Sequence, residues 1–140
     1  MTMATSLALV LGVAMFNAPI TRAPIALLWT SFAGAALFCY LMLLQVIATS
    51  ARGAQLLSSL VVFPLIMIGG SFFPFETMPP WMAEIGRWTP NGLAVTQVKQ
   101  ILFGQLDVRA ILTAAAGIGV PAVAAFLWGV RRIAGAFATN

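Results

Sequence analysis

The sequence predicts an all-α membrane protein, and three observations lead to this fold class. Hydrophobic residues make up 61% of the 140 residues, and charged residues only 7%. A soluble domain carries about a quarter charged residues, so this chain lacks the polar surface that a soluble globule needs. The apolar residues also fall into long runs. Helices satisfy their own backbone hydrogen bonds, which makes them suitable for placing such runs in lipid.

Four apolar runs have roughly the length that crosses a bilayer. About 20 mainly apolar residues span a hydrocarbon core roughly 30 Å thick. We therefore expect four transmembrane helices in a single domain, residues 1–140, with spans at approximately 4–20, 24–48, 54–73 and 110–130. The first three spans are joined by loops too short to cross the membrane, so neighbouring spans are antiparallel.

The first span is expected to be retained rather than cleaved as a secretory signal. Signal peptides carry Lys or Arg ahead of their apolar centre, and neither residue precedes Leu7 in this chain. The predicted location is therefore a cell membrane, crossed several times, which would be the cytoplasmic membrane in a prokaryote. The basic residues do not decide the orientation. They divide three to four between the two sides, with Arg52, Arg131 and Arg132 on one and Arg22, Arg87, Lys99 and Arg109 on the other.

The residue inventory excludes several chemistries. The chain has no His, so the usual zinc sets and His-based catalytic triads are absent, and its single Cys39 forms no intrachain disulfide. A P-loop needs Gly-Lys-Ser/Thr, whereas the only lysine, Lys99, follows Val98. The basic residues form no run with interleaved aromatics, so nucleic acid is not an expected partner. We expect no enzyme activity, no metal and no directly bound cofactor.

The last span carries a predicted packing strip. Small or turn-forming residues recur every four positions, and such strips allow helix backbones to approach closely in lipid. The strip consists of Thr113, Gly117, Pro121, Ala125 and Gly129.

The segment after the third span, IMIGGSFFPFETMPPWM at residues 66–82, breaks the apolar pattern. Gly69 and Gly70 weaken a helix, and Pro74 ends or kinks it. A short helix at about 79–88 can then begin with proline in its first turn. Its apolar face consists of Trp81, Ile85 and Trp88.

A second short helix is predicted at about 93–103, after a turn at residues 89–92. Its expected apolar side is Ala94, Val98, Ile101 and Leu102, and its expected polar side is Gln97, Lys99 and Gln100. Gly104 suits its C-terminal cap, and Asp107 suits an N-cap of the last span.

Neither short helix is long enough to span a bilayer. One interpretation is a helical hairpin that dips partway into the membrane as a lid over a pathway, since bent backbone at that depth must line a cavity or pack in protein. The other is an interfacial loop anchored by its aromatic residues. Glu76, beside Phe75, is the acid of most interest, and Glu84 and Arg87 are spaced to form a weak surface pair.

These segments together resemble a known family. A span, then PLIMIGGSFFPFETMPPWM, then RWTPNGLAVTQVKQILFG, then a final span closed by basic residues is similar to the C-terminal portion of type-2 ABC transporter permeases. These are the membrane subunits of ATP-binding-cassette exporters. The stretch from NAPITRAPIALLWTS to SSLVVFPL also resembles their third-to-fifth-span region, so the resemblance covers nearly the whole chain.

The resemblance implies a dimeric export permease of six spans per subunit, powered by ABC ATPase domains that bind ATP. It further implies a re-entrant helical pair before the last span, on the outer side of the membrane, and places Arg52 and Arg131 in the cytoplasm. Residues expected at this outer gate are Gly69, Gly70, Phe73, Pro74, Glu76, Pro79, Pro80, Trp81 and Pro90. Residues expected in helix packing are Gly117, Pro121 and Ala125.

The chain departs from the family in having four expected spans rather than six. The missing spans would be the first two, and the cytoplasmic coupling helix that docks the ATPase would precede Met1. The expectation is therefore a fragment or one piece of a split permease. Two alternatives are a small four-span carrier driven by protons and a membrane assembly subunit without transport activity. The proton-driven carrier needs an acid within the membrane, whereas all three acids lie in the polar connection.

Overall fold

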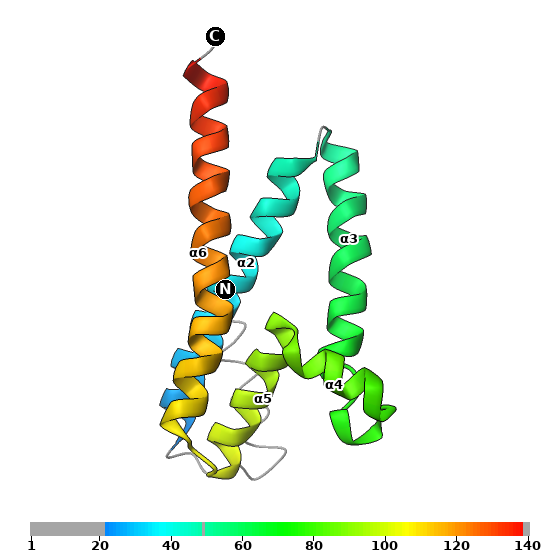
Figure 1. The fold of residues 1–140 in the computed structure, drawn as a ribbon, viewed down its shortest axis with the longest axis vertical. Helices are drawn as coiled ribbons and strands as arrows, with labels where there is room; N and C mark the ends of the chain where they lie inside the picture. The colour runs from blue at the N-terminus through cyan, green and yellow to red at the C-terminus, as the bar shows by residue number, and fades with distance from the viewer. Residues whose placement is uncertain (1–21, 49, 139–140) are drawn as a thin grey trace.

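A computed structural model describes residues 22–48 and 50–138 of the chain (Figure 1). Within these ranges the protein is all helical and contains no β-strand, which confirms the predicted fold class at this level. The helices are α2 (Ala23–Ile47), α3 (Ala51–Ile68), the 3-10 helix η2 (Phe75–Thr77), α4 (Pro80–Trp88), α5 (Pro90–Phe103) and α6 (Val108–Ala138). The expected span at 4–20 lies outside the described residues.

Three of these helices are long and apolar enough to cross a membrane, as expected of a multi-pass membrane protein. They are Ala23–Ile47, Ala51–Ile68 and Val108–Gly135. The first agrees with the prediction of 24–48. The last extends beyond the predicted 110–130 and continues through Arg131 and Arg132 to Ala138, because no glycine cap or proline stops it there.

The third predicted span, 54–73, is shorter than expected and starts earlier, because local caps define both its ends. Ser50 is the N-cap of α3, and its side-chain oxygen accepts a hydrogen bond from the Gly53 N–H at 3.1 Å. The helix ends at Ile68, followed by Gly69 and then Gly70 with φ of 78°. This left-handed backbone favours glycine, so Gly70 turns the chain out of the helical path.

Helices α2 and α6 lie side by side in the same direction along much of their length (Figure 1). The buried contact is made of small side chains, including Ala33 and Ala36 on α2 and Ala122 on α6. The Tyr40 hydroxyl donates a hydrogen bond to the Ile118 carbonyl oxygen at 2.8 Å. Small residues allow this close approach, which replaces the hydrophobic driving force that is missing between helices in lipid.

The buried face of α6 differs from the predicted strip. It consists of Ala114, Ile118, Ala122, Ala125 and Gly129. The strip predicted at every fourth residue shares only the last two of these, and Thr113, Gly117 and Pro121 are exposed. The reason is helical geometry: with 3.6 residues per turn, a four-residue step drifts by about 40° around the helix. A face that stays against α2 therefore needs an occasional three-residue step.

Helix α3 stands apart from the other two long helices over much of its length (Figure 1). None of its residues is buried, and Leu56, Leu60 and Phe63 are each more than three-fifths exposed. It meets α2 at the turn that joins them and contacts α4 and α5 at its other end. Its apolar surface is thus available to lipid or to another protein.

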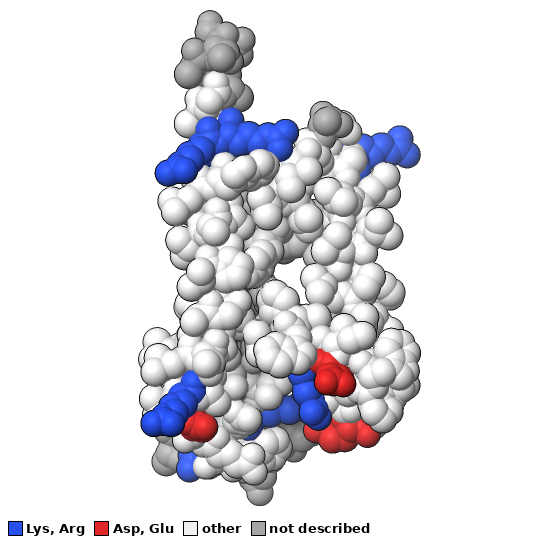
Figure 2. Space-filling view, in the orientation of Figure 1, with Lys and Arg blue, Asp and Glu red and all other residues white. Residues whose placement is uncertain are grey.

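Charged side chains lie at the two ends of the bundle and leave an apolar band between them (Figure 2). One end, here called the arginine end, holds Arg52 where α3 begins and Arg131 and Arg132 near the end of α6. The opposite end, here called the acidic end, holds the three acids together with Arg22, Arg87, Lys99 and Arg109. This division of the basic residues agrees with the one predicted from the sequence.

Candidate functional site

The candidate site is the helical hairpin formed by α4 and α5, here called the hairpin, with the loop 69–79 that leads into it. A single residue, Thr89, joins the two helices as C-cap of α4 and N-cap of α5. Its hydroxyl donates to the Gly86 carbonyl oxygen at 2.6 Å and accepts from the Gly92 N–H at 3.0 Å. The prediction that residues 89–92 form a separate turn was therefore wrong, because Pro90 occupies the first position of a capped helix.

The tip of the hairpin, here residues 86–94, packs backbone against backbone. A Cβ added at Gly92 would lie 2.8 Å from the Gly86 carbonyl carbon, and one added at Gly86 would lie 3.1 Å from the Ile68 carbonyl carbon. Any larger side chain at either glycine would collide with these main-chain atoms. The two glycines thus bring α4 against α5 and against the end of α3.

Asn91 fastens the hairpin tip to α3. Its side-chain Nδ2 donates to Ser71 Oγ at 2.9 Å and lies 3.4 Å from the Leu65 carbonyl oxygen and 3.5 Å from that of Gly69. Carbonyls in the last turn of a helix lack partners within the helix. The Leu65 carbonyl oxygen already accepts from the Gly69 N–H at 2.8 Å, so Asn91 gives it a second donor from more than 20 residues away. The turn-like sequence context of Asn91 does not reveal this role.

The hairpin tip reaches well into the bundle. The Trp29 indole Nε1 of α2 donates to the Ala94 carbonyl oxygen at 3.0 Å, and this hydrogen bond is buried. A Cβ at Gly117 of α6 would lie 3.5 Å from Leu93 Cδ1. Gly117 is nine residues beyond Val108, so at 1.5 Å per residue the tip lies about 14 Å along α6 from the acidic end.

Helix α5 is the most enclosed element of the site, and one prediction about it was wrong. Gln97, expected on the polar side, is 5% exposed. It follows Ala94 by three residues and precedes Ile101 by four, so all three share a buried face. Within the described chain, the side-chain oxygens of Thr96, Gln97 and Gln100 are buried and have no hydrogen-bond partner.

At the acidic end, Phe75 fills the space between the loop and the hairpin. Its ring is buried, and a Cβ at Gly70 or at Gly86 would lie 2.7 Å or 3.0 Å from it. The charged groups of Arg87 and Lys99 stand 5.7 Å and 5.9 Å from the ring centroid, within the range of cation–π attraction. Phe75 therefore holds the loop, α4 and α5 together.

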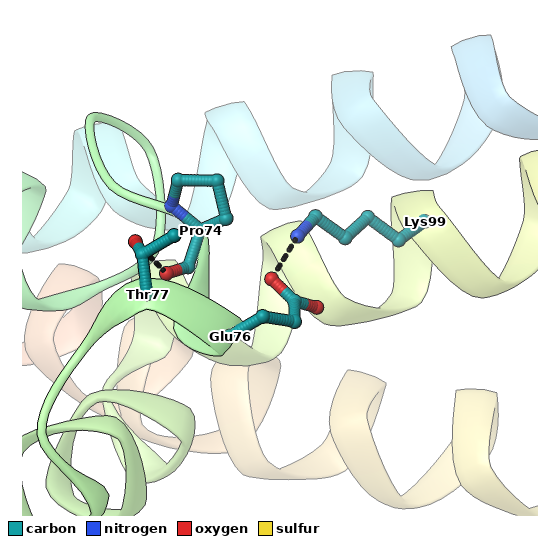
Figure 3. Close-up of polar contacts among 4 residues, drawn as sticks. All are labelled: Pro74, Glu76, Thr77 and Lys99. Carbon is teal, nitrogen blue, oxygen red and sulfur yellow. Dashed lines mark hydrogen bonds and ion pairs between the residues drawn. The ribbon is translucent and has the colours of Figure 1, made fainter.

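Glu76 extends toward α5 and forms an ion pair with Lys99, whose Nζ lies 3.5 Å from Glu76 Oε2 (Figure 3). Hydrogen bonding from its own backbone N–H and the nearby Lys99 charge lower the pKa of the Glu76 carboxyl below its usual value. Both side chains remain open to solvent, so the pair is weak. Arg87, expected beside Glu84, stands over Phe75 instead.

The other predicted site residues shape the loop and the helix starts. Gly69 caps α3, Pro79 is the N-cap residue of α4, and Pro80 and Pro90 begin α4 and α5. The Pro74 carbonyl oxygen accepts hydrogen bonds from the Thr77 N–H at 3.0 Å and the Thr77 hydroxyl at 2.8 Å (Figure 3). Phe73 is exposed, as are Trp81, Ile85 and Trp88 on one face of α4.

Residues 22–48 and 50–138 contain no cluster of three side chains that could hold a metal ion. Comparison of the chain with family models, with curated proteins and with solved structures finds no match.

Proposed function

We propose that this chain is the membrane-spanning permease part of an ABC-type exporter, and that the hairpin is a re-entrant element of its outer gate. The position of the hairpin tip is the observation that supports this most. Helices α4 and α5, of 9 and 14 residues, are too short to span a bilayer, yet Leu93 packs at the level of Gly117. Both ends of the hairpin lie toward the acidic end of the bundle (Figure 1).

The polar side chains of α5 fit the lining of a pathway. Unpaired buried oxygens are costly in an apolar surrounding, and among the described residues α5 carries such oxygens on Thr96, Gln97 and Gln100. A water-filled or substrate-filled route beside α5 would supply their missing partners. Movement of the hairpin around Phe75 and the Glu76–Lys99 pair would open this route.

Transport in this proposal depends on partners. An ABC ATPase subunit binds and hydrolyses ATP, and a second permease copy completes the pathway as a dimer within membrane lipid. The exposed apolar side of α3 offers surface for the second copy or for lipid. The first expected span, at 4–20, and the cytoplasmic location of the arginine end also belong to this proposal.

A proton-driven carrier is less well supported. Its three candidate acids, Glu76, Glu84 and Asp107, precede or follow the apolar spans and lie at the acidic end. A proton relay would need one of them inside the membrane.

Accessibility labelling tests the re-entrant hairpin. In a Cys39→Ala background, single cysteines at Thr77, Trp88 and Arg52 would be treated on intact cells with a membrane-impermeant maleimide. We expect Thr77→Cys to react, Arg52→Cys to react only after the cells are opened, and Trp88→Cys to react more slowly than Thr77→Cys. Reaction of Thr77→Cys only from the inside would contradict the proposal.

Co-purification tests the ATPase partner. A tagged complete permease that contains this segment should recover an ABC ATPase from membranes, and vesicles with both should transport only when ATP is supplied. Transport driven by a proton gradient without ATP, and lost in Glu76→Gln, would instead favour the carrier.

A further inference from the structure

An apolar groove opens between α2, α5 and α6 near the acidic end. Its walls include Ile25, Trp29 and Phe32 of α2, Ile101 of α5, and Ile111 and Ala115 of α6. Its volume is about 290 Å³, at the lower limit of about 300 Å³ for ligand pockets. Ile25 and Phe32 are each more than two-fifths exposed, so the groove faces the surroundings of the bundle.

A cation lies one helical turn away from two walls of this groove. Arg22 is one helical turn before Ile25, and its guanidinium lies against Gly104, one turn after Ile101. A Cβ at Gly104 would lie 3.0 Å from Arg22 Cζ. Nη1 of Arg22 is buried and has no hydrogen-bond partner among the described residues. A buried guanidinium N–H without an acceptor is costly, and carboxylate or phosphate oxygens are its strongest partners.

We propose that this groove and Arg22 together bind one phospholipid, with part of an acyl chain in the groove and the phosphate on the Arg22 guanidinium. The apolar walls supply no polar partner, which suits a hydrocarbon chain. The volume suits part of one chain rather than a whole lipid. The Arg22 charge matches the phosphate at the level where a membrane places its headgroups. This lipid site is separate from the unpaired oxygens of α5 and does not depend on which substrate the chain transports.

The test uses the full chain purified in detergent and native mass spectrometry with three probes. These are phosphatidylglycerol, a diacylglycerol with the same acyl chains, and glycerol 3-phosphate. We expect one phosphatidylglycerol to bind at least tenfold more tightly than the diacylglycerol, and no binding of glycerol 3-phosphate. Equal binding of the diacylglycerol would show an apolar groove without a phosphate site, and binding of glycerol 3-phosphate alone would show an anion site. Either result overturns the proposal.

Matched variants locate the site. Arg22→Gln and Ala115→Phe should each weaken phosphatidylglycerol binding at least tenfold, because they remove the phosphate contact and fill the groove. Arg52→Gln, at the opposite end, and Ala116→Phe, on the exposed side of α6, should leave it unchanged. Arg22→Lys should retain part of the affinity and serves as the second variant if Arg22→Gln loses its helical circular dichroism. Equal affinities in Ala115→Phe and Ala116→Phe would also overturn the proposal.

Discussion

The Trp29 indole and the Ala94 carbonyl oxygen are 65 residues apart in sequence and form a buried hydrogen bond of 3.0 Å. This bond connects α2 with the first turns of α5 and so fixes the hairpin inside the bundle. The Ala94 carbonyl oxygen belongs to the backbone hydrogen-bond pattern of α5, so Trp29 is not its only source of a hydrogen-bond donor. The indole N–H, by contrast, is hydrogen-bonded to this carbonyl alone among the described residues.

Replacing Trp29 by Phe should lower the free energy of unfolding by about 1 kcal/mol, the usual net value of an intramolecular hydrogen bond. Thermal or SDS-induced unfolding in detergent would measure it. Trp81→Phe, on the exposed face of α4, is the matched control and should cost less than about 0.5 kcal/mol. An equal loss in both variants would mean that ring volume, not the hydrogen bond, determines the effect.

Replacing Gly86 by Ala should destabilise the protein by about 1–3 kcal/mol, because the added methyl group collides with the backbone at Ile68. Gly34→Ala in α2 is the control, since no heavy atom lies within 4 Å of an added Cβ there. It should be neutral or stabilise by up to about 1 kcal/mol, because Ala favours helix over Gly. A stabilising Gly86→Ala variant would show that the hairpin does not pack against α3 in this way.

Replacing Thr89 by Val should cost about 1 kcal/mol, because it removes the N-cap of α5 and the bond to Gly86. Thr96→Val is the same change on the same helix, at a hydroxyl oxygen that is buried and unpaired in the described chain. It should be neutral or stabilising, since it removes an unsatisfied polar group. Urea or SDS titration followed by circular dichroism measures both. The informative result is which of the two variants has the lower free energy of unfolding.

The Glu76 carboxyl should titrate below its usual range in the folded protein, and NMR of a ¹³C-labelled carboxyl measures this. A lowered pKa means that the charged form favours the folded arrangement, so this contribution is present near neutral pH and is lost as pH falls through the folded value. Lys99→Gln should raise the pKa of Glu76 part of the way back, since the backbone N–H remains. Arg109→Gln should not change it.

In the complete permease, Glu76→Gln should reduce transport more than Glu84→Gln, because Glu76 contacts α5 through Lys99. Initial rates of ATP-driven efflux in vesicles would compare the two. Efflux at the wild-type rate from both variants would remove Glu76 from the gate.

The sequence by itself determined the three long helices and the existence of the two short ones. Apolar runs of span length can satisfy their backbone in lipid only as helices. Local signals also set several boundaries correctly: Gly104 is the left-handed cap of α5 with φ of 85°, and the Asp107 side chain accepts from the Arg109 N–H at 2.9 Å at the start of α6. Such caps involve residues within a few positions of each other, so the sequence contains the whole interaction.

Only the tertiary structure decided which surfaces meet. The burial of Gln97, the attachment of Asn91 to the end of α3 and the placement of Arg22 against Gly104 all join residues distant in sequence. Helical periodicity places residues on a common face but does not identify the neighbour of that face. In a bundle whose helices are apolar all round, polarity alone cannot separate inner from outer positions. Close packing of small residues determines which positions face inward, and this packing depends on the arrangement of all the helices together.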